Sequence, residues 1–484
     1  MQSTTLKLKT FKLSFDSILQ GKYFSAICAC LVVILHSLNL TTVGFGLMMG
    51  MMAYCFFTQK DLLPILSILS LLFYVISPGF VGDVDNFDGI IGKYKFFVIV
   101  FSLGCVACIV GAIYHYTTHK KSFVKSKLLV PTIALCVCIL LSGAFTPYYF
   151  STLNFGIISS LIFVYLPLIF FVYNSTSRLT LDWVAKTVLM VGVVACIQLL
   201  LYYLFNIRDI NHIIEDKYIR LGWAWHNGIG ILIVACIPAS FYLAYRHVGS
   251  STMRSFGYII LALAMYCVQL LTLSRSSLMF GSLLVVVMFG MLFLKSNFQV
   301  RMQLIVATVV VLLIGVVVGF VFKEQVRIAF DRLLGLGFDD SERFDWWKLA
   351  IDVFKKYPIF GVGWEYNQDS WINYQPFFAI HSTPLQFLAS TGLVGFLASV
   401  WLFVVKCKVF FKNNNFGKWF VLSIVIVFEV IGLIEVLMNA PYFLIIIFIV
   451  LAGVELNSTR LSSIDDKVVN DEKGVCKEEN DICT

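Results

Sequence analysis

Charged side chains are scarce in this chain of 484 residues. Asp, Glu, Lys and Arg make up 13% of it, whereas 59% of the residues are hydrophobic and the mean hydropathy is +0.88. A soluble protein carries about twice that share of charge, so the composition excludes an ordinary soluble fold. Apolar runs long enough to cross about 30 Å of hydrocarbon recur along nearly the whole chain. The sequence therefore predicts an all-α polytopic membrane protein.

Other absences narrow the function. No basic patch with interleaved aromatic residues occurs, and the net charge of +8 belongs to predicted loops, which indicates topology and contact with anionic lipid rather than nucleic acid. Nothing resembles a metal cluster or a nucleotide-binding loop, so neither a metal nor a cofactor is expected. None of the thirteen cysteines falls in a predicted external loop, which argues against a disulfide framework. For Cys105 and Cys108, packing as small side chains within an apolar span is favoured over a metal site or a redox pair.

The apolar runs predict about 12–14 transmembrane helices. Alternation from a basic N-terminus without a small-residue cleavage site, hence a cytoplasmic start, places the basic loops on the cytoplasmic side. The Asp83–Asp88 loop and one large loop, 323–384, then fall on the opposite side. The fourteen spans are placed at 23–40, 42–58, 62–80, 96–116, 128–145, 155–173, 184–205, 228–245, 255–274, 277–294, 302–322, 385–405, 419–437 and 441–455.

The large external loop is too long for a passive connection. Apolar residues recur at helical spacing in Gln325–Leu334 and again in Arg343–Tyr357, so two amphipathic helices are expected. Pro358 stops the second helix, and Gly361-Val362-Gly363 supplies a tight turn. This pattern predicts a pair of helices that cap a cavity.

Three side chains on the external side are candidates for chemistry. Arg220 lies in the loop before span 228–245, ahead of Trp223 and Trp225, and a cation that reaches the membrane interface is an equally good interpretation of it. Arg275, between the hydroxyls of Ser274 and Ser276, interrupts an apolar run; it could bind headgroup phosphate at a tight turn or offer its guanidinium to a diphosphate. His381 precedes span 385–405, where a capping role competes with proton transfer.

In their order and external placement these residues resemble the O-antigen ligase and polymerase family of membrane glycosyltransferases. The resemblance spans about 215–405 and rests on Arg220, the Ser274-Arg275-Ser276 turn, the Arg343 and Trp347 helix, the P-x-x-G-V-G turn at 358–363 and the H-S-x-P-L-Q-x-L-x-x-x-G-L-x-G run at 381–395. Two positions depart from the pattern of the family: Ser382 directly after the histidine, and His226 before Asn227. These departures bear on the subfamily rather than on the class. The chain then divides into N-terminal transmembrane helices (1–205), a ligase-like catalytic region (206–405), C-terminal transmembrane helices (406–455) and a disordered cytoplasmic tail (456–484).

The resemblance implies a metal-independent, inverting transfer of a glycan from undecaprenyl diphosphate at the periplasmic face of the bacterial inner membrane. Arg220 and Arg275 would bind the diphosphate, His381 would act as base, and Ser274, Ser276, Arg343 and Trp347 would support them. The favoured acceptor is the lipid A core of lipopolysaccharide. A polymerase that extends another lipid-linked repeat, or a relative that glycosylates protein, would use the same chemistry.

Two further points stay open at this stage. A flippase or transporter of the same lipid could also use many spans, although no half-to-half repeat is visible. Glu429 and Glu435 lie in span 419–437; packing within a polar interior is the favoured interpretation, and orientation of a catalytic side chain is the weaker one.

Overall fold

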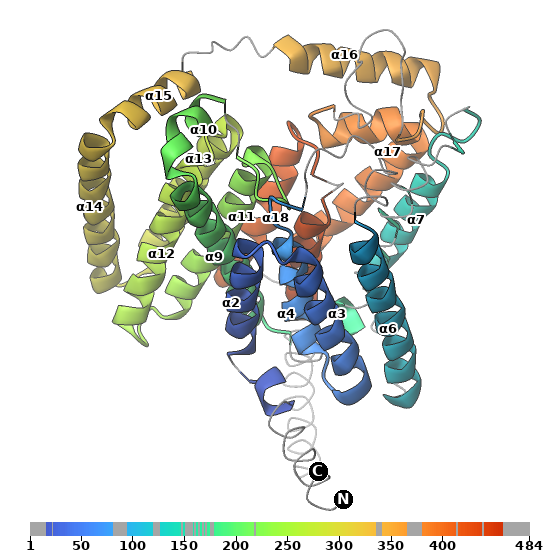
Figure 1. The fold of residues 1–484 in the computed structure, drawn as a ribbon, viewed down its shortest axis with the longest axis horizontal. Coiled ribbons are helices and arrows are strands. Elements are labelled where there is room, and N and C mark those ends of the chain that lie inside the picture. Colours follow the sequence, from blue (N-terminus) through green and yellow to red (C-terminus); the bar gives the residue numbers. More distant parts are fainter. Residues whose placement is uncertain are drawn as a thin grey trace, which may run out of the picture.

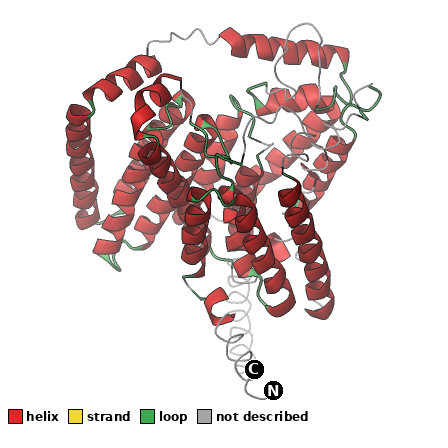
Figure 2. Cartoon of the chain, viewed as in Figure 1, coloured by secondary structure: helices red, strands yellow, loops and turns green. Residues whose placement is uncertain are grey.

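The computed structural model describes residues 16–80 except 22, 94–119, 126–150 except 147 and 148, 179–216, 219–334, 341–364, 380–412, 415–437 and 440–457, with scattered positions between 158 and 174. Within these ranges the chain is helical without β-strands; one isolated bridge joins Arg220 and Trp225. Figure 1 and Figure 2 show a bundle of helices. The predicted all-α fold is confirmed.

The described elements follow one another along the chain as helices of different lengths. Eight of the described helices, α3, α6, α9, α11 to α14 and α17, are long and apolar enough to cross a membrane. The elements are α2 (Phe24–Ser37), α3 (Thr41–Thr58), α4 (Leu63–Leu71), η1 (Leu72–Val75), α6 (Lys95–His119), α7 (Leu129–Leu140), α9 (Leu181–Phe205), η2 (Ile207–Asp209), α10 (Ile210–Asp216), α11 (His226–Arg246), α12 (Thr252–Leu270), α13 (Arg275–Lys295), α14 (Phe298–Val321), α15 (Lys323–Leu334), α16 (Ser341–Lys356), α17 (Thr383–Phe410), α18 (Phe416–Gly432) and a last helix, Pro441–Asn457.

The predicted spans coincide with these helices, with shifted ends. Span 155–173 lies mostly outside the described residues, as do the Asp83–Asp88 loop and nearly all of the predicted tail. Span 62–80 is shorter than expected, since its α-helix ends at Leu71 and continues as one 3-10 turn. Span 385–405 is longer, so that Lys406 lies within α17 rather than in a loop. The complete span count stays a prediction.

Helix α11 forms the centre of the bundle, whereas α14 is mostly exposed at its edge. Nearly all of α11 is buried, between α9, α12, α13 and α18. Its polarity relative to α18 follows from one contact: the Tyr245 ring near the end of α11 stacks on Phe420 near the start of α18, with 5.5 Å between centroids. The two helices therefore run antiparallel. The turn after α18 lies at the same end of the bundle as the start of α11.

The predicted amphipathic helices are present as α15 and α16. Figure 1 shows both lying across the end of the bundle where α10 and the first part of α17 are found. We call this the His381 end. The opposite end carries Arg246 and Lys295, the last residues of α11 and α13, and we call it the basic end.

Candidate active site

Helix α16 is held in place by a small hydrophobic core of its own. Ala350 and Val353 of α16 are buried against Val362, Ile380 and Ala389, and further apolar side chains of α16 and α17 pack around them. Trp347 belongs to this packing and makes an edge contact with Phe344 at 5.5 Å. Trp347 therefore fixes the position of α16, and with it the position of Arg343.

The glycine-rich turn after α16 inserts into a break in α17. Gly392 has non-helical dihedral angles (φ 64°, ψ −165°) within α17. The freed backbone groups pair with the turn: Val362 N donates to Ala389 O at 3.0 Å, and Leu393 N donates to Pro358 O at 2.8 Å. Gly361 has φ +67°, and a Cβ there would lie 2.4 Å from the carbonyl of Ser390. The P-x-x-G-V-G pattern thus serves to dock α16 on α17.

His381 lies two residues before α17 and has an unusual backbone conformation. His381 has φ +49°, which is uncommon for a residue other than glycine. Gln386, one turn into the helix, accepts a hydrogen bond from Ile380 N at 3.1 Å, and its amide donates to Ser390 Oγ at 2.9 Å. These bonds hold the segment before α17 in place. Backbone strain of this kind is often found at functional sites.

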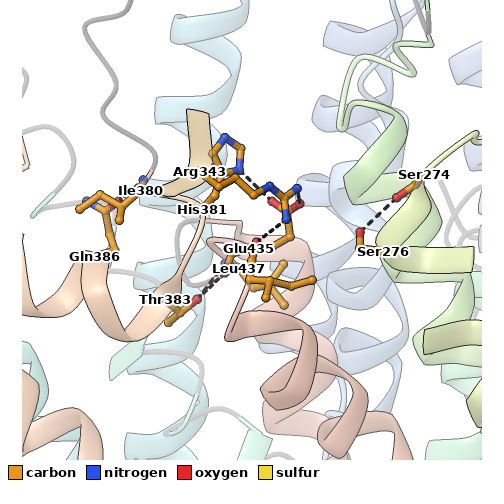
Figure 3. Close-up of polar contacts among 10 residues, drawn as sticks. Ser274, Ser276, Arg343, Ile380, His381, Thr383, Gln386, Glu435 and Leu437 are labelled. Atoms are coloured by element: carbon orange, nitrogen blue, oxygen red, sulfur yellow. Dashed lines mark hydrogen bonds and ion pairs between the residues drawn. The ribbon is translucent and has the colours of Figure 1, made fainter. Parts of the chain in front are cut away.

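Glu435, in the turn after α18, joins His381 to Arg343. One carboxylate oxygen lies 3.2 Å from His381 Nδ1, and the other accepts from Arg343 Nη2 at 3.0 Å (Figure 3). The Glu435 side chain is only 9% exposed, compared with 26% for Arg343 and 38% for His381. Thr383 Oγ1 donates to Glu435 O at 2.9 Å and fixes the turn to α17. The three side chains come from three separate elements.

This contact selects one form of the imidazole. An ionised carboxylate only accepts hydrogen bonds, so Nδ1 of His381 is the donor toward Glu435. Neutral imidazole then carries its lone pair on Nε2, which is the form required of a general base. Arg343 balances the charge of Glu435 and also donates to Ile434 O at 3.4 Å.

Arg220 belongs to a short hairpin directly before α11. Its guanidinium carbon lies 3.9 Å from the centroid of the Trp225 ring, and Leu221 N donates to Ala224 O at 3.0 Å. His36 Nε2 lies 2.9 Å from Leu221 O, in a buried contact with α2. The hairpin is therefore anchored to the bundle, and Arg220 lies at the His381 end.

Arg275 is the first residue of α13. Ser274 caps this helix by accepting from Ser277 N at 3.4 Å, and the hydroxyls of Ser274 and Ser276 are 3.3 Å apart (Figure 3). The turn packs on the first part of α11, because a Cβ at Gly230 would lie 2.6 Å from Ser277 Oγ. Nε of Arg275 is buried and has no hydrogen-bond partner among the described residues.

The predicted site residues thus form two groups at the same end of the bundle. His381 and Arg343 are in one hydrogen-bonded group, and Arg220 and Arg275 flank the start of α11. For Glu435 the sequence favoured packing over orientation of a catalytic side chain, and the structure places its carboxylate against His381 and Arg343. Its signal was an acidic side chain at the edge of a membrane span. Within the described ranges, no cluster of three or more His, Cys, Asp or Glu side chains could hold a metal ion.

The fold and site define a polytopic α-helical membrane protein with an Arg–Glu–His group at one end. Residues 260–400 match the family model for O-antigen ligase, which supports the predicted resemblance to that family over this region. No curated protein matches the chain. The matched region includes Arg275, Arg343 and His381, whereas Arg220 and Glu435 lie outside it. The family supports a glycosyl-transfer enzyme.

Proposed function

We propose that the protein transfers a glycan from undecaprenyl diphosphate to the lipid A core of lipopolysaccharide, at the periplasmic face of the bacterial inner membrane. The Glu435 contacts to His381 and Arg343 carry this proposal, because a carboxylate at Nδ1 would leave Nε2 of His381 able to accept a proton at the end of the bundle. The O-antigen ligase match over 260–400 supports the class of reaction.

The reaction is a single displacement with inversion. A hydroxyl oxygen of the acceptor sugar bonds to the anomeric carbon of the donor glycan, while the bond from that carbon to the diphosphate oxygen breaks. The hydroxyl proton passes to Nε2 of His381, and the resulting imidazolium is stabilised by the Glu435 carboxylate. Undecaprenyl diphosphate leaves with the electron pair. No metal ion takes part in this scheme.

The leaving diphosphate needs positive charge that is already in position. Arg220 and Arg275 have this role in the proposal, with the Ser274 and Ser276 hydroxyls beside Arg275. Arg343 supports His381 indirectly, through Glu435.

A purified-protein assay tests the function. Protein in detergent is mixed with an undecaprenyl-diphosphate glycan and with each acceptor in turn: lipid A core, a second lipid-linked repeat, or a peptide. We expect product with lipid A core, and loss of about 10²–10⁴-fold in rate for His381→Ala, the usual contribution of a positioned base. Arg275→Ala should also abolish most transfer, whereas Lys348→Ala, on the exposed side of α16, is the control.

Two outcomes would contradict the proposal. Transfer that survives both His381→Ala and Arg275→Ala would exclude the mechanism. Product with the second lipid-linked repeat alone would leave the mechanism intact and identify a polymerase instead.

A further inference from the structure

A groove at the basic end, far from His381, has no role in the reaction proposed above. It is a cavity of about 490 Å³, within the size range of small-molecule sites. Its floor is one face of α9, where Trp183, Lys186, Met190 and Val193 follow one another at helical spacing. We call it the α9 groove.

Apolar walls rise on both sides of this floor. Phe24 and Ala26 of α2 form one side with the start of α4, and Tyr258 and Leu261 of α12 form the other. The Ser25 and Ser67 hydroxyls bond to each other at 2.8 Å, so they satisfy one another within the wall. An apolar groove that begins near a helix end and follows a membrane helix is suited to a hydrocarbon chain.

The mouth of the groove is basic. Lys186 is exposed there, one turn into α9, and has no salt-bridge partner in the part of the chain that the structure describes. The nearby acid Asp182 is already occupied, by Arg246 Nε at 3.1 Å and by the Tyr242 hydroxyl at 2.5 Å. Asp182 therefore offers little repulsion to an incoming anion.

Further positive charge lies behind the α12 wall. The His247 ring stacks on Tyr258 with 5.8 Å between centroids and 6° between planes. Partial burial, followed by the charges of Arg254 and Lys186, lowers the pKa of His247 below its ordinary value. Arg254 and Lys186 therefore both act on His247, which lies beside the Tyr258 wall of the groove.

We infer that the α9 groove binds one anionic phospholipid of the adjoining leaflet, with an acyl chain along Met190 and Val193 and the phosphate at Lys186. Charge complementarity selects this occupant, because a zwitterionic lipid places an ammonium beside the same cations. Trp183 at the mouth suits the headgroup region, where tryptophan is enriched. The site is separate from the glycan-transfer site, so it does not depend on the proposed function.

Native mass spectrometry of the purified full chain tests this inference. Phosphatidylglycerol and phosphatidylethanolamine with identical acyl chains are titrated in turn, and sn-glycerol phosphate serves as the free anion. We expect wild type to retain one phosphatidylglycerol preferentially. Lys186→Gln should reduce that preference about fivefold, which corresponds to about 1 kcal/mol for one cation near an anionic surface. Lys186→Arg should preserve it.

Two variants separate the groove from general surface charge. Ala26→Phe fills the α9 groove without changing a charge and should abolish retention of the bound lipid. Lys295→Gln removes a cation from the same end of the bundle, beside Phe416 and outside the groove, and should leave retention unchanged. Equal retention of both lipids, displacement by glycerol phosphate alone, full retention in Ala26→Phe, or an equal loss in Lys295→Gln would each overturn the inference. Size-exclusion profiles confirm that the variants are folded.

Discussion

Two acidic side chains close together in the chain have different kinds of partner. Glu429, within α18, pairs with a single cation, Lys406 Nζ of α17, at 2.7 Å. Glu435, just after α18, contacts a base and a cation from two other elements, His381 and Arg343. Acidity at membrane depth alone does not distinguish a pair that joins two helices from a group that orients an imidazole. The identity of the partners does.

The largest expected difference in transfer rate between the two positions comes from replacing each glutamate, Glu435 or Glu429, by glutamine. Glu435→Gln should lower the rate of glycan transfer at least about tenfold, with about 10⁴-fold as the upper limit known for a triad carboxylate changed to an amide. The reason is that an amide has one acceptor oxygen, whereas His381 and Arg343 both donate. Initial rates with saturating donor and acceptor measure the effect.

Glu429→Gln is the matched control for that experiment. It makes the same chemical change on the same segment, away from His381, and should leave the rate per folded molecule unchanged. A Glu435→Gln enzyme as active as wild type would show that the carboxylate does not position His381. Equal losses in the two variants would mean that the effect is general damage to α18.

A smaller loss of transfer rate is expected when lysine replaces Arg343, because lysine keeps the positive charge but lacks the planar guanidinium. Arg343→Lys retains one contact to Glu435 but cannot also reach Ile434 O, because an ammonium lacks the planar fork of donors. One hydrogen bond contributes about 0.5–1.5 kcal/mol, so transfer should fall about two- to tenfold. Arg327→Lys, on exposed α15, is the comparison. A loss as large as that of His381→Ala would instead place Arg343 in direct contact with substrate.

Much of the fold could be predicted from the sequence because a membrane helix is a local feature. A run of apolar residues predicts its own helix wherever it packs, so the spans and the two amphipathic helices coincide with observed elements. The predicted helix ends were wrong in places, because ends depend on neighbouring segments. The α-helix in span 62–80 ends at Leu71, and α17 continues past Lys406. The break at Gly392 was also missed, since it exists only because the 358–363 turn supplies partners for the backbone.

The candidate site was predicted less completely. Arg275 and His381 stand out because a charged or titratable group at a membrane edge is rare. The role of Glu435 depends on three elements far apart in sequence, α16, α17 and the turn after α18, and no spacing rule connects them. Only the packing of Ala350 and Val353 on α17 brings Arg343 into reach of that carboxylate.

The smallest effect on transfer is expected from the pair at Glu429. Lys406→Met should destabilise the fold, because it leaves Glu429 without its cation between two helices. Breaking a fully buried pair costs about 3–5 kcal/mol. Because Lys406 is 15% and Glu429 27% exposed, we expect about 1–3 kcal/mol, seen as a lower Tm in detergent.

The double variant Lys406→Met with Glu429→Leu should recover most of that loss, since no uncompensated charge remains. Transfer per folded molecule should stay at the wild-type rate in both. A lower rate in the stable double variant would remove the distinction between the two glutamates, because it would mean that the Glu429 pair also acts on the site.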